Sequence, residues 1–138
     1  MKREYDRREL ACLRITPSGY FQPAATHKLT LVQQGDNCWI ETAEQLGRKR
    51  KQSRTSVAPE TVAQQLELLR NASIPAFPIS PLVCDGEYEE LTIHGEFSNL
   101  TLGWWTIAPA GADGLAEFAG WLRGLGLPDE DDQEDDNG

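Results

Sequence analysis

The stretch 84–105, with the sequence CDGEYEELTIHGEFSNLTLGWW, restricts the fold of this chain more than any other part of it. Asp85-Gly86 is typical of a two-residue type I′ turn, because both central residues of that turn need positive φ angles. Segments in which apolar and polar residues alternate lie on both sides of a second turn at 95–99. The pattern predicts an antiparallel meander with strands near Leu82–Cys84, Glu87–His94 and Leu100–Ile107.

The first third of the chain carries further strand signals. Apolar residues of one parity and the turn sequence Gln34-Gly35-Asp36-Asn37 predict one separate strand and then a hairpin over 27–42. The predicted strands are Leu10–Thr16, His27–Gln33 and Cys38–Thr42. Ala43–Gly47 is expected to form a short helical turn or a loop, and Arg48–Arg54 a solvated strand or loop.

Two segments have helical spacing. Pro59 suits the first position of a helix, and the apolar stripe Val62, Leu66 and Leu69 predicts a helix over about Pro59–Asn71. A second stripe follows Asp113, which is expected to act as the N-cap, and Pro128 blocks extension beyond it. The residues of this stripe are Leu115, Phe118, Leu122 and Leu125.

Strands separated from helices and joined by short turns indicate an α+β fold. We expect an antiparallel β-sheet of about six to seven strands, with two amphipathic helices packed on one face. Residues 1–127 are expected to form a single α+β domain. Residues 128–138 contain almost no apolar side chain and are expected to be a disordered acidic tail.

The second half of the chain resembles a pattern in small uncharacterised bacterial proteins. The residues that carry the resemblance are the run DG…YEEL.I, the pair Trp104-Trp105, Pro109 and the stripe Leu115…Phe118…Trp121-Leu122. The pattern combines a helix ending in "IP", a DG turn, an aromatic strand and a final amphipathic helix, and it covers about 59–125. The resemblance implies no activity and no catalytic residue.

Charge and cysteine usage favour a cytoplasmic protein. The formal net charge is −9, but seven negative charges lie within 129–136, which leaves −2 for the rest. No apolar run approaches the ~20 residues of a membrane-spanning helix, and the start MKREYDRREL lacks the apolar segment of a secretory signal. The odd number of cysteines, Cys12, Cys38 and Cys84, argues against a disulfide framework.

A basic run is the first candidate for function. Its cationic residues are Arg48, Lys49, Arg50, Lys51 and Arg54. Clustered cations bind phosphates and release counterions, so the run is a candidate for nucleic acid or for an acidic partner. Two alternatives are that it protects the edge of a sheet, or that the acidic tail lies over it.

Four aromatic or apolar residues are the candidate partner-binding set: Trp105, Ile107, Tyr20 and Phe21. Trp104 and Trp105 point to opposite faces if their strand is regular. Leu100, Leu102 and Trp104 form the more apolar set, which predicts that they face the helices. Trp105 and Ile107 then belong to the other face, shielded by the loop at 18–26 or left partly exposed.

No motif indicates catalytic residues, a metal site or a cofactor. His27 and His94 lack metalloenzyme spacing, the serines lack a nucleophile-elbow context, and no phosphate-binding glycine loop occurs. We therefore expect a non-catalytic protein-binding module. The alternatives are a nucleic-acid-associated protein that uses residues 48–54, and a small-molecule-binding or catalytic domain with a tryptophan-lined pocket.

Overall fold

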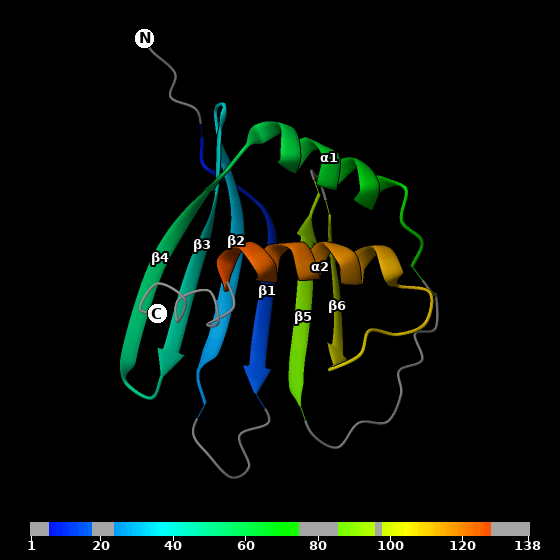
Figure 1. The fold of residues 1–138 in the computed structure, drawn as a ribbon. Coiled ribbons are helices and arrows are strands. Elements are labelled where there is room, and N and C mark those ends of the chain that lie inside the picture. Colours follow the sequence, from blue (N-terminus) through cyan, green and yellow to red (C-terminus); the bar gives the residue numbers. More distant parts are fainter. Residues whose placement is uncertain (1–5, 18–23, 75–85, 96–97, 128–138) are drawn as a thin grey trace, which may run out of the picture.

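The computed structural model describes residues 6–17, 24–74, 86–95 and 98–127. These ranges contain six strands and two helices (Figure 1), so the expected α+β class is confirmed. The elements are β1 Arg8–Pro17, β2 Thr26–Gln34, β3 Asn37–Leu46, β4 Lys49–Val57, α1 Pro59–Arg70, β5 Glu87–His94, β6 Asn99–Trp105 and α2 Asp113–Gly126.

The strands form one antiparallel sheet in the order β4-β3-β2-β1-β5-β6. β1 therefore lies inside the sheet, between the β2–β4 unit and the β5–β6 hairpin. Its alternation of buried and exposed residues is interrupted by a β-bulge between Glu9 and Ala11. The two edges of the sheet are β4 and β6.

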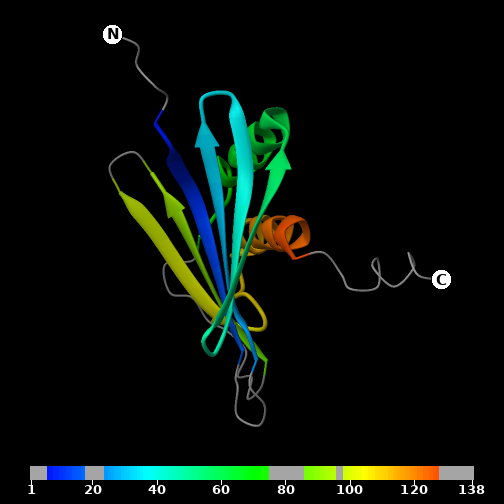
Figure 2. The same cartoon turned by 90° about the vertical axis from the view of Figure 1, so that its left-hand side faces the viewer.

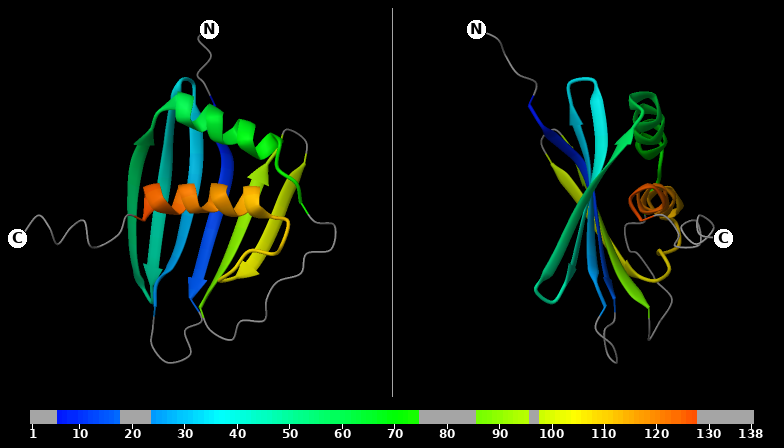
Figure 3. Two further views of the ribbon diagram at one scale, coloured as in Figure 1. Left: turned by 45° about the vertical axis from the view of Figure 1, so that its right-hand side comes forward. Right: turned by 60° about the vertical axis from the view of Figure 1, so that its left-hand side comes forward.

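Both helices lie on the same face of the sheet, and they run across the strands (Figures 2 and 3). We call this side the helix face and the other side the open face. The core lies between the helix face and the helices. Its fully buried side chains include Leu13, Leu29, Leu31, Ile40 and Leu91 from the sheet and Leu115, Phe118 and Leu122 from α2.

α2 is tied to the sheet by polar contacts near its C-terminal end. Near its C-terminus the Thr42 hydroxyl donates to the carbonyl oxygen of Gly126 at 3.4 Å. Arg123 forms an ion pair with Glu87 of β5 at 2.8 Å, and a second, longer one with Glu89 at 3.8 Å. Leu115 is fully buried near the N-terminal end of α2.

Neither helix in the described ranges has the length and apolar character that crossing a membrane requires.

Two local expectations are wrong. Ala43–Gly47 is not a helical turn or loop, because β3 continues to Leu46 and pairs with both β2 and β4 along this stretch. The chain reverses only at Gly47, whose φ of 61° favours glycine. Asp113 is the first residue of α2 and not its N-cap, which is Ala112. The Asp113 carboxylate still lies in the first turn, where the helix dipole favours negative charge.

Other expectations are confirmed. Pro59 begins α1, which ends one residue before the predicted limit, and the turn after β2 lies at Gly35 and Asp36. Gly86 has a φ of 118°, a value that favours glycine, but the two-residue turn at Asp85-Gly86 stays a prediction because Asp85 lies outside the described residues. Tyr20, Phe21, the strand near Leu82–Cys84 and the tail 128–138 also lie outside them.

Candidate binding surface

Trp104 and Trp105 lie on opposite faces of the sheet, as strand alternation predicts. Trp104 is on the helix face and is 4% exposed, whereas Trp105 is on the open face and is 45% exposed. The register of β6 with β5 sets this arrangement, because Trp104 pairs with Glu89 and Trp105 pairs with Tyr88. The open face therefore presents a large, half-exposed indole at the β6 edge.

Tyr88 and Trp105 form an aromatic pair on the open face. Their ring centroids are 5.3 Å apart and their planes are tilted by 57°. Gly103 makes room for the pair, because a Cβ at this position would lie 1.9 Å from the Tyr88 hydroxyl oxygen. The missing side chain of Gly103 thus lets the tyrosine ring lie across β6 beside the indole.

Ile107 is 52% exposed, but it does not share the open face through strand alternation as expected. β6 ends at Trp105, and Thr106 has a φ of 58°, which breaks the extended geometry. The Ile107 amide donates to the Trp105 carbonyl oxygen at 2.5 Å in the tight turn that follows. Ile107 therefore adds exposed apolar surface within two residues of Trp105.

A second tryptophan on the open face is covered by charged side chains. Trp39 of β3 is 6% exposed, since the Arg54 guanidinium lies 3.7 Å from its ring centroid. The Trp39 indole N–H donates to Glu41 at 2.9 Å, and Glu41 also binds Arg7. Hydrogen bonding from Trp39 is the main cause that lowers the pKa of Glu41, with a further contribution from Arg7.

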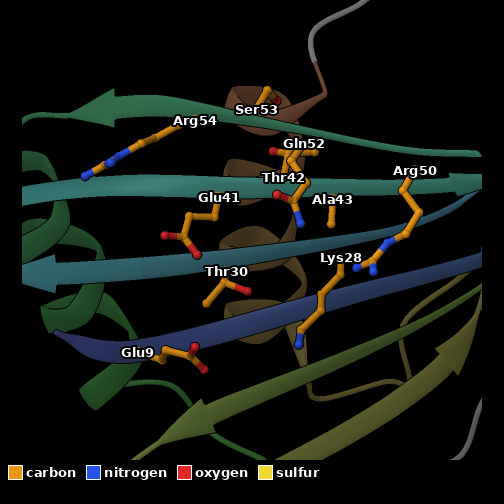
Figure 4. Close-up of a pocket in the computed structure, with 10 residues that line it drawn as sticks. All are labelled: Glu9, Lys28, Thr30, Glu41, Thr42, Ala43, Arg50, Gln52, Ser53 and Arg54. Atoms are coloured by element: carbon orange, nitrogen blue, oxygen red, sulfur yellow. The ribbon is translucent and has the colours of Figure 1, made fainter.

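Two adjoining hollows lie on the open face over β2, β3 and β4, with volumes of about 490 Å³ and 340 Å³. Lys28, Ala43 and Arg50 line both, and Arg14 lines the smaller one. In Figure 4 the Arg50 side chain extends from β4 over β3 toward Lys28. We call the region lined by Arg14, Lys28 and Arg50 the cationic hollow.

The three cations of this hollow make no ion pair with any acidic side chain in the part of the chain that the structure describes. Arg14 and Lys28 are direct cross-strand partners. Like charges opposite one another on a sheet destabilise it. The hollow therefore carries three cations without an ion pair in the described residues, and an anionic group would stabilise them.

The sheet register connects the cationic hollow with the aromatic pair. Two sets of paired residues lie end to end across the open face. The first is Trp105, Tyr88 and Thr16, and the second is Thr26, Gln45 and Arg50. Thr16 and Thr26 lie one position beyond the last pair of β1 with β2, which is Ile15 with His27. We call the two sets together the row. Arg14 and Lys28 lie in the adjacent row, where Glu90 pairs with Arg14. With strands about 4.8 Å apart, five strand spacings place Trp105 and Arg50 about 24 Å apart at the backbone.

The basic run does not form one continuous stripe. Arg48 lies in the turn before β4. The alternation of β4 directs Lys49 and Lys51 to the helix-face side, and Arg50 and Arg54 to the open face. Arg54 is already engaged with Trp39. Arg50 lines both hollows, whereas Arg54 lines only the larger one, so Arg50 is the residue of the run that lies beside Arg14 and Lys28.

The tryptophans do not gather around one pocket. Trp39 and Trp105 share the open face, but three strands separate β3 from β6, a distance of about 19 Å. Trp104 faces the helices and Trp121 of α2 packs against Phe118, with ring centroids 5.5 Å apart. The two hollows have no tryptophan in their linings.

Titratable groups of the described residues do not converge in a way that indicates catalysis. Burial is the main cause that raises the pKa of Glu89, and Arg123 acts in the opposite direction. Glu89 lies on the helix face, where its role is to hold α2. Among the ranges that the structure describes, no group of three or more His, Cys, Asp and Glu residues could hold a metal ion.

Sequence reasoning missed Tyr88, Arg14 and Lys28. The sequence shows that Tyr88 and Leu91 lie on opposite faces of a regular strand. It does not show that Tyr88 pairs with Trp105, because that pairing depends on the register between β5 and β6. Arg14 and Lys28 come together only through the β1–β2 register.

A comparison of the chain with family models, with curated proteins and with solved structures finds no match.

Proposed function

We propose that this chain is a non-catalytic, cytoplasmic protein-binding module that docks its partner on the open face. The observation that carries the proposal is the half-exposed Trp105 on that face, which packs at a tilt against Tyr88. Tryptophan combines a large apolar area with one N–H donor, and it is enriched among residues that dominate binding energy at protein interfaces.

The arrangement around Trp105 supports a binding role over a purely structural one. Both helices lie on the helix face, so in the described residues the aromatic pair has no layer packed over it. The aromatic pair is also preorganised, because Gly103 leaves the space in which Tyr88 lies. An anchor held in one conformation loses little entropy when a partner binds.

The reduced cysteines fit the cytoplasmic part of the proposal. Cys12 and Cys38 are free, and both are buried. Free thiols of this kind are typical of proteins from reducing compartments, where cysteine acts as a small apolar side chain.

The test is capture of partners from extracts of the native cell, with the full chain as bait. Trp105→Ala should lose a partner that the parent retains. Leu68→Ala is the matched control, because Leu68 is 62% exposed on α1 and lies away from the open face. A partner held equally by the parent, the Leu68 variant and the Trp105 variant would refute the proposal.

Nuclease treatment and salt separate protein binding from nucleic acid binding. A partner held through Trp105 should remain bound after nuclease digestion, and its affinity should fall with salt less steeply than that of a nucleic acid held by many phosphates. Phosphate contacts instead weaken steeply as salt rises. Neutralising Arg48, Lys49 and Lys51 together should leave capture in place, whereas loss of a nucleic acid site in the basic run would abolish it.

A further inference from the structure

We infer that the cationic hollow is the site at which the partner's carboxylates bind, so the partner segment is acidic at one end and apolar at the other. This inference rests on the proposed function, and it adds the chemistry of the partner. The apolar end would contact the aromatic pair of Tyr88 and Trp105. The acidic end would lie over Arg14, Lys28 and Arg50.

Charge complementarity is the first argument. Arg14, Lys28 and Arg50 are all exposed, they come from three different strands, and none of them forms an ion pair within the described residues, although Glu90 is the cross-strand neighbour of Arg14. Arg14 lies opposite Lys28 on one side and opposite Glu90 on the other, and a bound carboxylate would offset the repulsion between Arg14 and Lys28. Arg7 and Arg54, by contrast, are already engaged on the same face, through Glu41 and Trp39.

The polar groups between the two ends suit a peptide. Thr16, Thr26 and Gln45 lie in the row that joins Trp105 to Arg50, and all three are exposed or partly exposed. Hydroxyl and amide side chains can donate to and accept from a peptide backbone. A partner segment crossing the strands along this row would therefore find hydrogen-bonding groups along its length.

The spacing of the two ends sets the length of the segment. From β6, three strand spacings reach Lys28 on β2 and five reach Arg50 on β4, or about 14 Å and 24 Å. An extended peptide covers about 3.3 Å per residue. The acidic residues should then lie roughly four to seven positions from the apolar anchor.

Acidic side chains around the hollow argue for a short acidic peptide over a nucleic acid strand. Glu90 is the cross-strand partner of Arg14, while Glu9 and Glu41 line the larger hollow. A phosphodiester chain carries one charge per nucleotide along its whole length, and it would meet these carboxylates as well as the cations. A peptide with a few carboxylates at one end avoids them.

The probe is a fluorescently labelled peptide with leucine at one end and glutamates four to seven positions away, measured by anisotropy with the full chain. Arg14→Gln/Lys28→Gln/Arg50→Gln should weaken its binding at least about tenfold, because three charge pairs are lost. The matched control, Arg48→Gln/Lys49→Gln/Lys51→Gln, removes the same net charge from the basic run but leaves Arg14, Lys28 and Arg50 in place. It should bind the probe nearly as the parent does.

Two further measurements complete the test. Replacing the glutamates of the peptide by glutamine should weaken binding to the parent as much as the hollow variant does. Lys28→Glu/Arg50→Glu should reverse the preference, so that a lysine version of the peptide binds better than the glutamate version. The reversal provides a gain of binding, which an unfolded variant cannot give.

The inference is wrong if the parent does not bind the glutamate peptide, or if the triple Arg14/Lys28/Arg50 variant and the control variant weaken its binding equally. It is also wrong if single-stranded DNA of equal charge binds more tightly than the peptide, or if Lys28→Glu/Arg50→Glu does not reverse the preference. The proposed function is refuted by a different result, which is that Trp105→Ala captures the partner as well as the parent does. If capture requires Trp105 but does not require Arg14, Lys28 and Arg50, the proposed function stands and only this inference is refuted.

Discussion

Trp104 and Trp105 are adjacent in β6, yet one is buried against the helices and the other is half-exposed on the open face. A single peptide bond thus separates a core residue from a candidate anchor. The two positions give a direct comparison of folding and binding within one strand.

Trp104→Ala should lose about 3–5 kcal/mol of unfolding free energy, because it removes a large buried side chain from the core. Trp105→Ala should lose clearly less, about 1–2 kcal/mol, since only the tilted contact with Tyr88 and part of its area are lost. Urea unfolding of both variants measures the difference. Equal destabilisation would mean that Trp105 serves the fold and not a partner.

Gly86→Val should destabilise the protein by about 3 kcal/mol or more. The φ of 118° is strained for a β-branched residue, and a Cβ here would lie 2.0 Å from the Thr106 hydroxyl oxygen. Thermal unfolding would report the loss. Gly120→Ala is the control, because a Cβ at Gly120 meets nothing within 4 Å and alanine favours the helix. A Gly86 variant that melts with the parent would show that the turn tolerates side chains.

Gly103→Ala should displace Tyr88 from Trp105 without unfolding the chain. The new Cβ would lie 1.9 Å from the Tyr88 hydroxyl oxygen, at the end of a side chain that can rotate away. We expect stronger quenching of tryptophan fluorescence by a soluble quencher, and weaker partner capture. Unchanged quenching, with the parent's capture retained, would mean that the aromatic pair does not depend on Gly103.

Glu89→Gln should change how stability depends on pH. Burial first, and then the neighbouring Glu87, raise the pKa of Glu89 in the folded chain, so the folded state holds this proton more tightly than the unfolded state. The contribution of Glu89 is therefore most favourable below the unfolded pKa of about 4.3, and it is lost as pH rises through the folded pKa. The stability of the parent relative to the variant should fall over that window. Denaturant midpoints at several pH values measure it, and a difference that rises with pH would contradict the assignment.

Trp39→Phe should move the pKa of Glu41 upward, toward its ordinary range. The indole N–H donates to the Glu41 carboxylate at 2.9 Å, and phenylalanine keeps the ring but has no donor. The stability that this depressed pKa provides is present above the unfolded pKa of about 4.3 and is lost as pH falls through the folded pKa. NMR titration of the Glu41 carboxyl carbon detects the shift. A Glu41 pKa that is unchanged in the variant would assign the effect to Arg7 instead.

The sequence predicts the helices and strands that have one buried side and one solvent-exposed side, because their apolar residues recur with a regular period. Alternation located β2, β5 and β6, and the stripes of Val62 and Phe118 located the two helices. The sequence does not distinguish a strand from a loop at β4, because both sides of this edge strand are solvated and its residues show no period of two. The same cause hid the end of β3, where Glu44 and Gln45 continue the ladder without an apolar partner.

The candidate site was only partly predictable. The outward direction of Trp105 followed from the inward direction of Trp104, because neighbouring strand residues alternate. The position of Ile107 could not be predicted in the same way, since the positive φ of Thr106 ends the strand alternation before it. The cationic hollow could not be predicted, because Arg14, Lys28 and Arg50 meet only when the register of four strands is known.

The strand order also has a consequence for how the chain folds. β1 to β4 pair with their neighbours in sequence, as do β5 and β6, and only the pairing of β1 with β5 joins residues about 70 to 80 positions apart. Closing such a large loop costs more entropy than closing a hairpin. The β1–β5 seam is therefore expected to form last and to limit the folding rate. The proposed binding row crosses that seam, so the surface would exist only after the slowest step of folding is complete.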